Sequence, residues 1–228
     1  MRRILSFLLL LCVLCSFTFS AQAAPQIIYQ YVGNTNKMRV ALTFDDGPHP
    51  RYTPQILDIL KEYGVSATFF CVGVNAETYP DLIVRELQEG HEVGNHTYNH
   101  YHVNKLTPSA LCNDITACNN ALEKITQRHV RLFRPPEGVC SNALKEVCET
   151  EDLTIVLWSV DTRDWAHTAP DEIYENVKKN VRNGSIILMH DFIGKNSPTP
   201  AALRRIIPML QELGYELVTV SQLLEGAE

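Results

Sequence analysis

Short apolar runs alternate with amphipathic segments along most of the chain. The apolar runs are rich in β-branched and aromatic residues and end at turn residues, which is typical of buried strands. Between them, apolar residues recur three and four positions apart, which predicts helices with one buried face. Strands are predicted at residues 40–44, 67–72, 131–134, 154–160, 185–189 and 216–219, with a very short one at 91–93.

Proline and glycine residues mark the ends of the predicted helices. Thr53 and Thr107 each precede a proline, which combines an N-cap residue with a first-turn proline. Strands that alternate with helices favour parallel pairing and the α/β class, and their number predicts a (β/α) barrel of about seven or eight units in a single domain. Helices are predicted to begin near residues 53, 79, 107, 169 and 200, and glycines 64, 90 and 214 end three of them.

The first 23 residues have the pattern of a secretory signal peptide. Arg2 and Arg3 precede an apolar stretch at residues 4–19, and residues 21–23 (Ala-Gln-Ala) form a small-x-small cleavage site. The apolar stretch is shorter than the roughly 20 residues of a membrane-spanning helix. We therefore predict cleavage after Ala23 and a secreted product without a membrane span. An uncleaved N-terminal anchor is the alternative.

The remaining chain divides into a short lead-in at residues 24–37 and one domain at residues 38–228. Removing Arg2 and Arg3 leaves 18 of the 20 basic residues against 26 acidic ones, a net charge of −8. An acidic chain lacks the basic face that phosphate contacts require, so nucleic acid is excluded as a partner. No segment has a coiled-coil or dimerisation pattern, so a monomer is expected.

Cysteine usage leaves the disulfide pattern open. Five cysteines follow the signal peptide, and this odd number leaves at least one thiol unpaired within the chain. Cys71 lies in an apolar run and is expected in the core. A bridge between Cys140 and Cys148 is one option that the sequence does not decide, and Cys112 and Cys118 complete the set.

Two adjacent carboxylates, Asp45 and Asp46, end the predicted strand at residues 40–44. The carboxyl ends of strands are where α/β barrels build their sites. Two like charges this close repel, so one would be protonated unless a cation or a donor intervened. A metal on one carboxylate and proton transfer by the other explain the pair. The alternative is a loop in which one aspartate caps a helix.

Two histidines, His96 and His100, follow the very short predicted strand. A spacing of four residues places two imidazoles on the same side of a helical turn, where both can bind one metal ion. Asp46 would complete a three-ligand site with an open position for water, and Asp45 would remain free as a base. The alternative is two surface histidines in a polar loop.

Polar residues also follow two further predicted strands. Arg134 could pair with a carboxylate and keep it ionised. Pro135 and Pro136 lack backbone donors, so the amide of Glu137 is the first one free to point into a cleft. His190 ends the strand at 185–189. The alternatives are an ordinary Pro-Gly turn and a structural histidine.

The strand at residues 154–160 is followed by two acids and an indole. Asp161, Asp164 and Trp165 leave the strand together, and the exposed face of an indole suits a sugar ring. The alternative for Trp165 is a tryptophan that covers the core.

Taken together, these segments resemble the polysaccharide deacetylases of carbohydrate esterase family 4, which share the nodulation-deacetylase-like homology domain. The resemblance runs from about Arg39 to Leu224 and places the catalytic domain at residues 38–228. Five motifs match in order: Thr43-Phe44-Asp45-Asp46-Gly47-Pro48, His96-Thr97-x-x-His100, Arg134-Pro135-Pro136-x-Gly138, Asp161-x-x-Asp164-Trp165 and Leu188-Met189-His190.

The resemblance implies a distorted (β/α) barrel with a groove across its top and a divalent metal held in it. Asp46, His96 and His100 would be the metal ligands. Zinc is the usual ion of the family, and cobalt, manganese or nickel sometimes replace it.

The resemblance also implies roles for the other motif residues. Asp45 would be the general base, His190 the general acid, and Arg134 would orient Asp45. Asp164 would support His190, with Asp161 as the other candidate for that role. The amide of Glu137 would help to hold the oxyanion, and Pro135, Pro136, Glu137 and Trp165 would line the groove against substrate.

One position departs from the family pattern. The family often has an aromatic residue where this chain has Glu137. The backbone role survives the change, but the side chain would line the groove, so we expect it to alter the choice of substrate.

The resemblance implies a secreted, metal-dependent N-deacetylase of N-acetylated glycans, such as peptidoglycan or chitin-type oligomers. An O-acetyl esterase acting on acetylated xylan or a similar glycan is the first alternative. A non-catalytic glycan-binding domain and a metallo-amidase that cuts a peptide stem are the others.

Overall fold

The computed structural model of the chain describes residues 26–30 and 37–225. The predicted signal peptide lies outside these residues, as does most of the predicted lead-in. The strands are β1 (Ile27–Ile28), β2 (Arg39–Asp45), β3 (Thr68–Cys71), β4 (Glu92–Asn95), β5 (Leu132–Phe133), β6 (Thr154–Val156), β7 (Val160–Asp161), β8 (Ile186–His190) and β9 (Glu216–Leu217). The α-helices are α1 (Tyr52–Tyr63), α2 (Gly73–Thr78), α3 (Pro80–Gln88), α4 (Pro108–Thr126), α5 (Asn142–Thr150), α6 (Pro170–Asn180), α7 (Thr199–Glu212) and α8 (Val220–Leu224).

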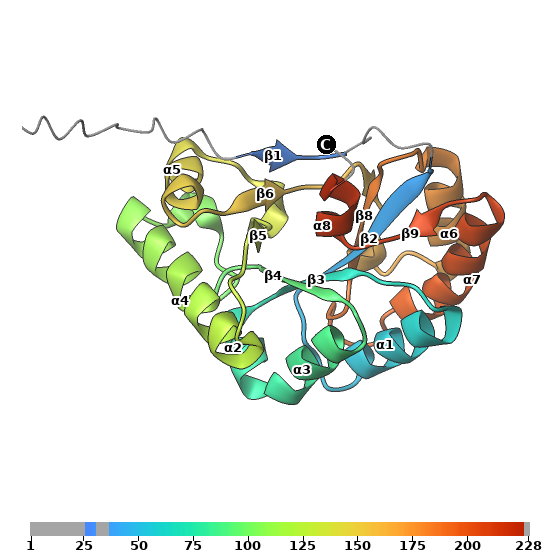
Figure 1. Cartoon of the computed structure of the whole chain (residues 1–228), viewed down its shortest axis with the longest axis horizontal. Helices are drawn as coiled ribbons and strands as arrows, with labels where there is room; N and C mark the ends of the chain where they lie inside the picture. Colours follow the sequence, from blue (N-terminus) through green and yellow to red (C-terminus); the bar gives the residue numbers. More distant parts are fainter. Residues whose placement is uncertain (1–25, 31–36, 226–228) are drawn as a thin grey trace, which may run out of the picture.

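The strands form one sheet in the order β1-β6-β5-β4-β3-β2-β8-β7, and β9 pairs with the start of β2. All strand pairs are parallel, and the long helices lie around the outside of the curved sheet (Figure 1). The prediction of a single-domain α/β protein with a distorted barrel is confirmed. Asp45 at the end of β2 pairs in register with His190 at the end of β8, so the two are neighbours across the sheet.

The predicted strand at residues 154–160 is wrong in its length, because it is divided into β6 and β7. The side chain of Arg134 donates to the carbonyl of Val156 from Nε and to that of Leu157 from Nη2, each at 3.1 Å. The amide of Leu157 donates to Ile28 of β1. The amide of Leu157 thus continues the β1–β6 pairing, but the carbonyls of Val156 and Leu157 are taken by a side chain instead of a neighbouring strand.

The predicted helices are present near the expected positions, but one of the two predicted N-cap residues is wrong. Thr107 caps α4, since its hydroxyl accepts from the amide of Ala110 at 3.2 Å. Gly64 ends α1 in the left-handed conformation, with φ of 64°. Thr53 is not the N-cap of α1, because this helix begins at Tyr52 and the Thr53 hydroxyl is engaged elsewhere.

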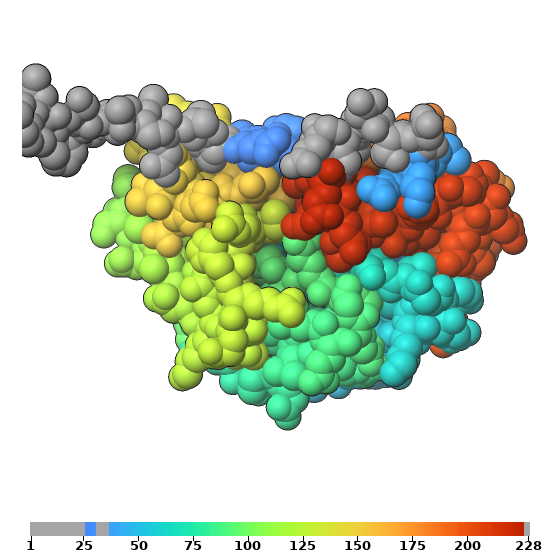
Figure 2. Space-filling model, in the orientation of Figure 1, coloured from blue at the N-terminus to red at the C-terminus, as the bar shows by residue number. Residues whose placement is uncertain are grey.

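The short helix α8 closes the end of the barrel opposite the carboxyl ends of the strands. Its amide at Val220 donates to Thr68, the first residue of β3, at 2.9 Å. Its Ser221 amide donates to Glu92, the first residue of β4, at 3.0 Å. In the space-filling view α8 (red) fills the middle of this face (Figure 2). Asp45 and His190 are the last residues of β2 and β8, so these two polar side chains lie at the other end of the barrel.

Strand β2 divides the core into an outer and an inner part. Val40, Leu42 and Phe44 pack outward in a cluster with α1 and α7. Ala41 belongs to an inner cluster with Phe70 of β3. Because side chains alternate along a strand, Thr43 and Asp45 also face the barrel interior.

The cysteines of the domain are all free thiols in the structure. The disulfide considered between Cys140 and Cys148 is therefore not formed. Cys71 lies in the buried core, as its apolar surroundings in the sequence predict. The described residues contain no helix that is long and apolar enough to cross a membrane.

Candidate active site

Arg134 fills the barrel interior beneath the site and holds Asp45. Its fully buried guanidinium donates from Nη1 to Oδ1 of Asp45 and to the hydroxyl of Thr43, both at 2.7 Å. It lies over the ring of Phe70, 4.2 Å from the centroid. Burial lowers the pKa of Arg134 and the Asp45 carboxylate acts against that lowering. An arginine stays protonated under such conditions, so the pair is a buried ion pair.

Asp46 faces the same site as Asp45 because β2 ends between them. Asp46 has φ of 76°, in the left-handed region, and this turn reverses the alternation of side chains. Its Oδ1 lies 3.0 Å from Nε2 of His100 and 3.4 Å from Nε2 of His96. Burial acts to raise the pKa of Asp46, but the two imidazoles outweigh it and hold that pKa well below its usual range.

Asp46, His96 and His100 form a group whose ligand atoms all lie within 4.8 Å of one another. His96 donates from Nδ1 to the carbonyl of Arg134 at 2.7 Å, so in the neutral ring the lone pair of Nε2 points toward Asp46. Asp46 Oδ1 is buried without a hydrogen bond of good geometry. An ionised carboxylate with an unpartnered oxygen and an oriented imidazole fit a divalent metal such as zinc.

The prediction that His96 and His100 share a helical turn is wrong, although their imidazoles do meet. Residues 96–100 form a loop, in which Thr97 has φ of 66° and His100 has φ of 57°. The side chain of Asn95 accepts from the amide of Thr97 at 2.7 Å, and the Thr97 hydroxyl accepts from the amide of His100 at 3.1 Å. These side-chain bonds replace the helical ones.

A buried acid that sequence reasoning missed anchors this loop from α4. One oxygen of Asp114 accepts from the amides of Tyr98 and Asn99, at 3.1 and 3.4 Å. The other accepts from the side chain of Asn99 at 2.6 Å. A buried acid on an otherwise amphipathic helix was the available signal, but its partner cannot be read from the spacing.

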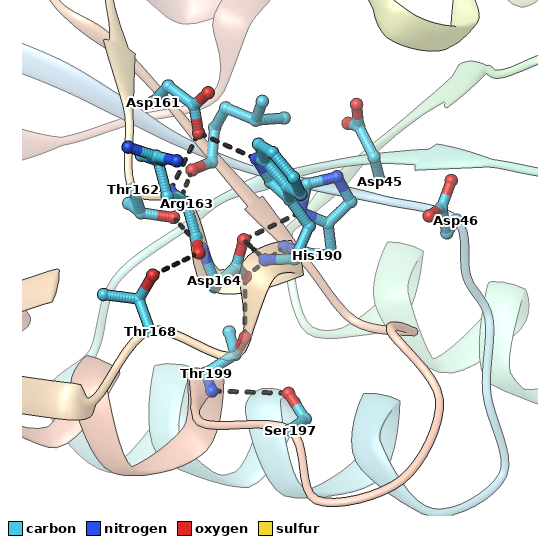
Figure 3. Close-up of polar contacts among 12 residues, drawn as sticks. Asp45, Asp46, Asp161, Thr162, Arg163, Asp164, Thr168, His190, Ser197 and Thr199 are labelled. Atoms are coloured by element: carbon cyan, nitrogen blue, oxygen red, sulfur yellow. Dashed lines mark hydrogen bonds and ion pairs between the residues drawn. The ribbon is translucent and has the colours of Figure 1, made fainter.

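Asp164 holds His190 from the side of the imidazole that faces away from Asp45 (Figure 3). Nδ1 of His190 and its own amide both donate to the Asp164 carboxylate, each at 2.8 Å. The hydroxyl of Thr199 donates to the same carboxylate at 2.7 Å. Burial acts to lower the pKa of His190, but Asp164 outweighs it and raises that pKa to about 9.

Of the two acids considered for this position, Asp164 contacts His190 and Asp161 does not. Asp161 accepts instead from the indole of Trp165 at 3.3 Å and from the amide of Arg163 at 2.8 Å. It therefore fixes the orientation of Trp165, whose side chain is about half exposed.

These residues surround one pocket of about 450 Å³. Glu137 enters it from the turn after β5, with φ of 60°, and its carboxylate lies 2.9 Å from Nδ1 of His102. Pro135 and Pro136 precede it and are buried. The pocket is lined by Asp45, Asp46, His96, His100, Glu137, Trp158, Asp161, Trp165, Leu188 and His190.

A second buried acid missed by sequence reasoning, Asp191, supports the turn after Asp46. It accepts a hydrogen bond from the Thr53 hydroxyl and lies against Gly47, where a Cβ atom would overlap its carboxylate. Burial is the main cause that raises the pKa of Asp191, to about 7. Its partners Thr53 and Gly47 are distant in the sequence, so no spacing pattern points to this role.

Comparison with known proteins gives the family. The polysaccharide deacetylase family profile matches residues 32–156. A peptidoglycan-N-acetylglucosamine deacetylase of Bacillus cereus is 43% identical over 191 residues, which cover 83% of this chain and 89% of that protein. The peptidoglycan-N-acetylmuramic acid deacetylase PdaC of Bacillus subtilis is 38% identical and covers 83% of this chain and 39% of its own length.

A solved structure agrees with the sequence matches. The crystal structure of the Bc1960 peptidoglycan N-acetylglucosamine deacetylase superposes with a TM-score of 0.82 and 38% identity, and covers 86% of this chain and 92% of that one. The chain therefore belongs to the polysaccharide deacetylase family, a class of hydrolases.

Proposed function

We propose that this chain is a secreted, metal-dependent N-deacetylase that hydrolyses the acetamido groups of N-acetylated glycans. One observation carries the proposal. Asp45 and His190 line the same pocket as Asp46, His96 and His100. Asp45 is paired with Arg134, and His190 is paired with Asp164, so the pocket holds one candidate base and one candidate acid.

The metal would be held by Asp46, His96 and His100. Zinc is the first choice for one carboxylate and two imidazoles, and Co²⁺, Mn²⁺ or Ni²⁺ are alternatives. A metal at such a site polarises a carbonyl oxygen and makes water more acidic. His96 is suited to this role because its Nδ1–H is already fixed by the carbonyl of Arg134.

Asp45 accepts the proton of the attacking water. Its neighbour Arg134 donates one hydrogen bond to Oδ1 of Asp45 and holds the carboxylate in place as a base for the water. The other oxygen of Asp45 lies 3.9 Å from Nε2 of His96, so the base is next to the metal ligands. The amide of Glu137 would stabilise the oxyanion that forms as water adds.

His190 donates a proton to the departing amine. Amines leave poorly without protonation, and a positioned acid typically contributes about 10²–10⁴-fold. With a pKa of about 9, His190 is protonated at neutral pH, as a general acid must be before the step. Asp164 holds the ring by Nδ1, which leaves Nε2 free to face the pocket.

The substrate would be a glycan of N-acetylated sugars, in peptidoglycan or chitin-type oligomers. The exposed indole of Trp165 offers a face for a sugar ring at the edge of the pocket. Action outside the membrane follows from the signal-peptide pattern of residues 1–23.

Acetate release from a glycan panel tests the proposal. The panel holds oligomers of N-acetylglucosamine, peptidoglycan strands and acetylxylan, each with and without a chelator, alongside Asp45→Asn. The expected result is chelator-sensitive release from N-acetylated glycans that Asp45→Asn abolishes.

The alternatives give different results in the same assay. Release only from acetylxylan would favour the esterase, and new amino termini without acetate would favour the amidase. Glycan binding without any acetate would favour a non-catalytic domain, and the related BA3943 of Bacillus anthracis is described as a pseudoenzyme of this family.

A further inference from the structure

The pocket carries two carboxylates that the proposed reaction does not use as acid, base or metal ligand. Glu137 lies on the β5 side and Asp161 on the β7 side. Within the described part of the chain, neither forms an ion pair with a lysine or arginine. They therefore add negative charge that a bound sugar meets next to the reacting group.

The two sides of the pocket differ in charge. On the β7 side, the guanidinium of Arg163 lies over the Trp165 ring, 5.9 Å from its centroid, and Asp161 is engaged by two hydrogen bonds. On the β5 side, the partner of Glu137 is His102, an imidazole that is neutral unless protonated. The β5 side is consequently the more anionic one.

Glu137 is also accessible to a ligand. More than half of its side chain, and of that of His102, is exposed to solvent. The left-handed backbone of Glu137 and the buried prolines before it fix where the side chain leaves the turn. A sugar next to the reacting residue on the β5 side would lie beside this carboxylate.

Resting on the function proposed above, we propose that Glu137 determines which neighbouring sugar the enzyme accepts. Its negative charge disfavours a neighbour that bears a carboxylate, such as the lactyl group of muramic acid. The same charge tolerates a neutral N-acetylglucosamine as the neighbouring sugar and favours an already deacetylated, cationic glucosamine. The preferred substrate is then a run of N-acetylglucosamine units rather than a glycan with free muramic acid carboxylates.

The test compares two glycans that differ only in this charge. One is a peptide-free strand of alternating N-acetylglucosamine and N-acetylmuramic acid, and the other is the same strand with its lactyl carboxylates converted to primary amides. For the unchanged chain, kcat/KM for acetate release should be about three- to tenfold higher on the amidated strand. In Glu137→Gln, which keeps the size and removes the charge, this ratio should fall to about one.

Two further measurements show whether the ratio depends on the charge of Glu137 or on the shape of its side chain. The ratio for the unchanged chain should shrink toward one at about 1 M salt, because an exposed charge is screened there. Among the residues that the structure describes, His102 is the one ion-pair partner of Glu137, so His102→Gln removes it and the ratio should be at least as large as in the unchanged chain. A ratio that is independent of salt, or that His102→Gln reduces to one, would overturn the proposal.

Asp152→Asn is the matched control. Asp152 is also an acid with positive φ, at 54°, and forms an exposed ion pair with Arg131 outside the pocket. This variant should keep the ratio of the unchanged chain, and all variants should unfold at similar temperatures.

The two proposals fail in different ways. If no glycan yields acetate, the deacetylase function itself is wrong. If acetate is released but the ratio is the same in the unchanged chain and in Glu137→Gln, only the role of Glu137 is wrong.

Discussion

The Asp164 carboxylate accepts hydrogen bonds from both Nδ1 and the backbone amide of His190, each at 2.8 Å. This contact raises the pKa of His190 to about 9 despite burial. As the proposed general acid, His190 is active in its protonated form, so activity should fall as the pH rises through about 9.

Asp164→Asn should therefore reduce kcat and shift its alkaline limb to lower pH. The pKa of His190 falls toward its ordinary value of 6.5 when the carboxylate charge is lost, so less of the acid is protonated at neutral pH. We expect about a 100-fold loss of kcat at pH 8. A pH–rate profile checks this, and an unshifted alkaline limb would show that Asp164 does not control the proton donor.

Arg134→Met should destabilise the fold and abolish activity together. The substitution leaves the Asp45 carboxylate, which is 3% exposed, without its cation. Breaking a buried pair in this way typically costs about 3–5 kcal/mol. Urea unfolding measures the loss, and the double variant with Asp45→Asn should recover part of the stability. A single variant as stable as the unchanged chain would mean that the pair is not needed for the barrel interior.

Asp114→Asn should weaken metal binding although Asp114 contacts Tyr98 and Asn99 rather than the proposed metal ligands. Asp114 accepts hydrogen bonds from the amide of Tyr98 and from the side chain of Asn99. In the variant, the side-chain NH₂ of asparagine would face one of these donors, and that hydrogen bond would be lost. Changes to groups that orient metal ligands typically cost about 10–100-fold in affinity.

Competition with a coloured chelator measures the zinc affinity of this variant directly. Asp171→Asn, at an exposed acid near the start of α6, is the control and should bind zinc as the unchanged chain does. Equal zinc affinity in Asp114→Asn would show that the loop keeps its shape without this anchor.

Gly47→Ala should disrupt the turn that follows Asp46, a proposed metal ligand. A Cβ atom at this position would overlap the carboxylate of Asp191. Overpacking of this kind typically costs about 1–3 kcal/mol. Because the overlap involves one side chain, Gly47→Ala combined with Asp191→Ala should be less destabilised than the sum of the two single variants. Additive effects in thermal or urea unfolding would contradict this arrangement.

The sequence predicted that the proposed ligands and proton-transfer residues would meet in space, because each of them ends or follows a strand of a parallel sheet. The pattern around residues 40–44 and 185–189 predicts β2 and β8, and their parallel pairing places Asp45 beside His190. The apolar pattern predicts these two strands because it reflects which residues are buried.

The shape of the loops was not predictable in the same way. The His96 to His100 loop depends on side-chain hydrogen bonds from Asn95 and on Asp114, a residue distant in the sequence. The choice between Asp161 and Asp164 depends on the 3₁₀ turn at Asp164–Ala166, preceded by Arg163 in the left-handed conformation. Such backbone turns are set by tertiary contacts, which a spacing rule does not contain.

The proposed reaction requires one cation bound by Asp46, His96 and His100 beside Asp45. Anomalous diffraction at the zinc absorption edge, from crystals grown with one equivalent of zinc, locates that ion. We expect one peak about 2.0–2.2 Å from a carboxylate oxygen of Asp46 and from Nε2 of both histidines. A peak elsewhere in the domain, or no peak at this group while zinc is bound, would contradict it.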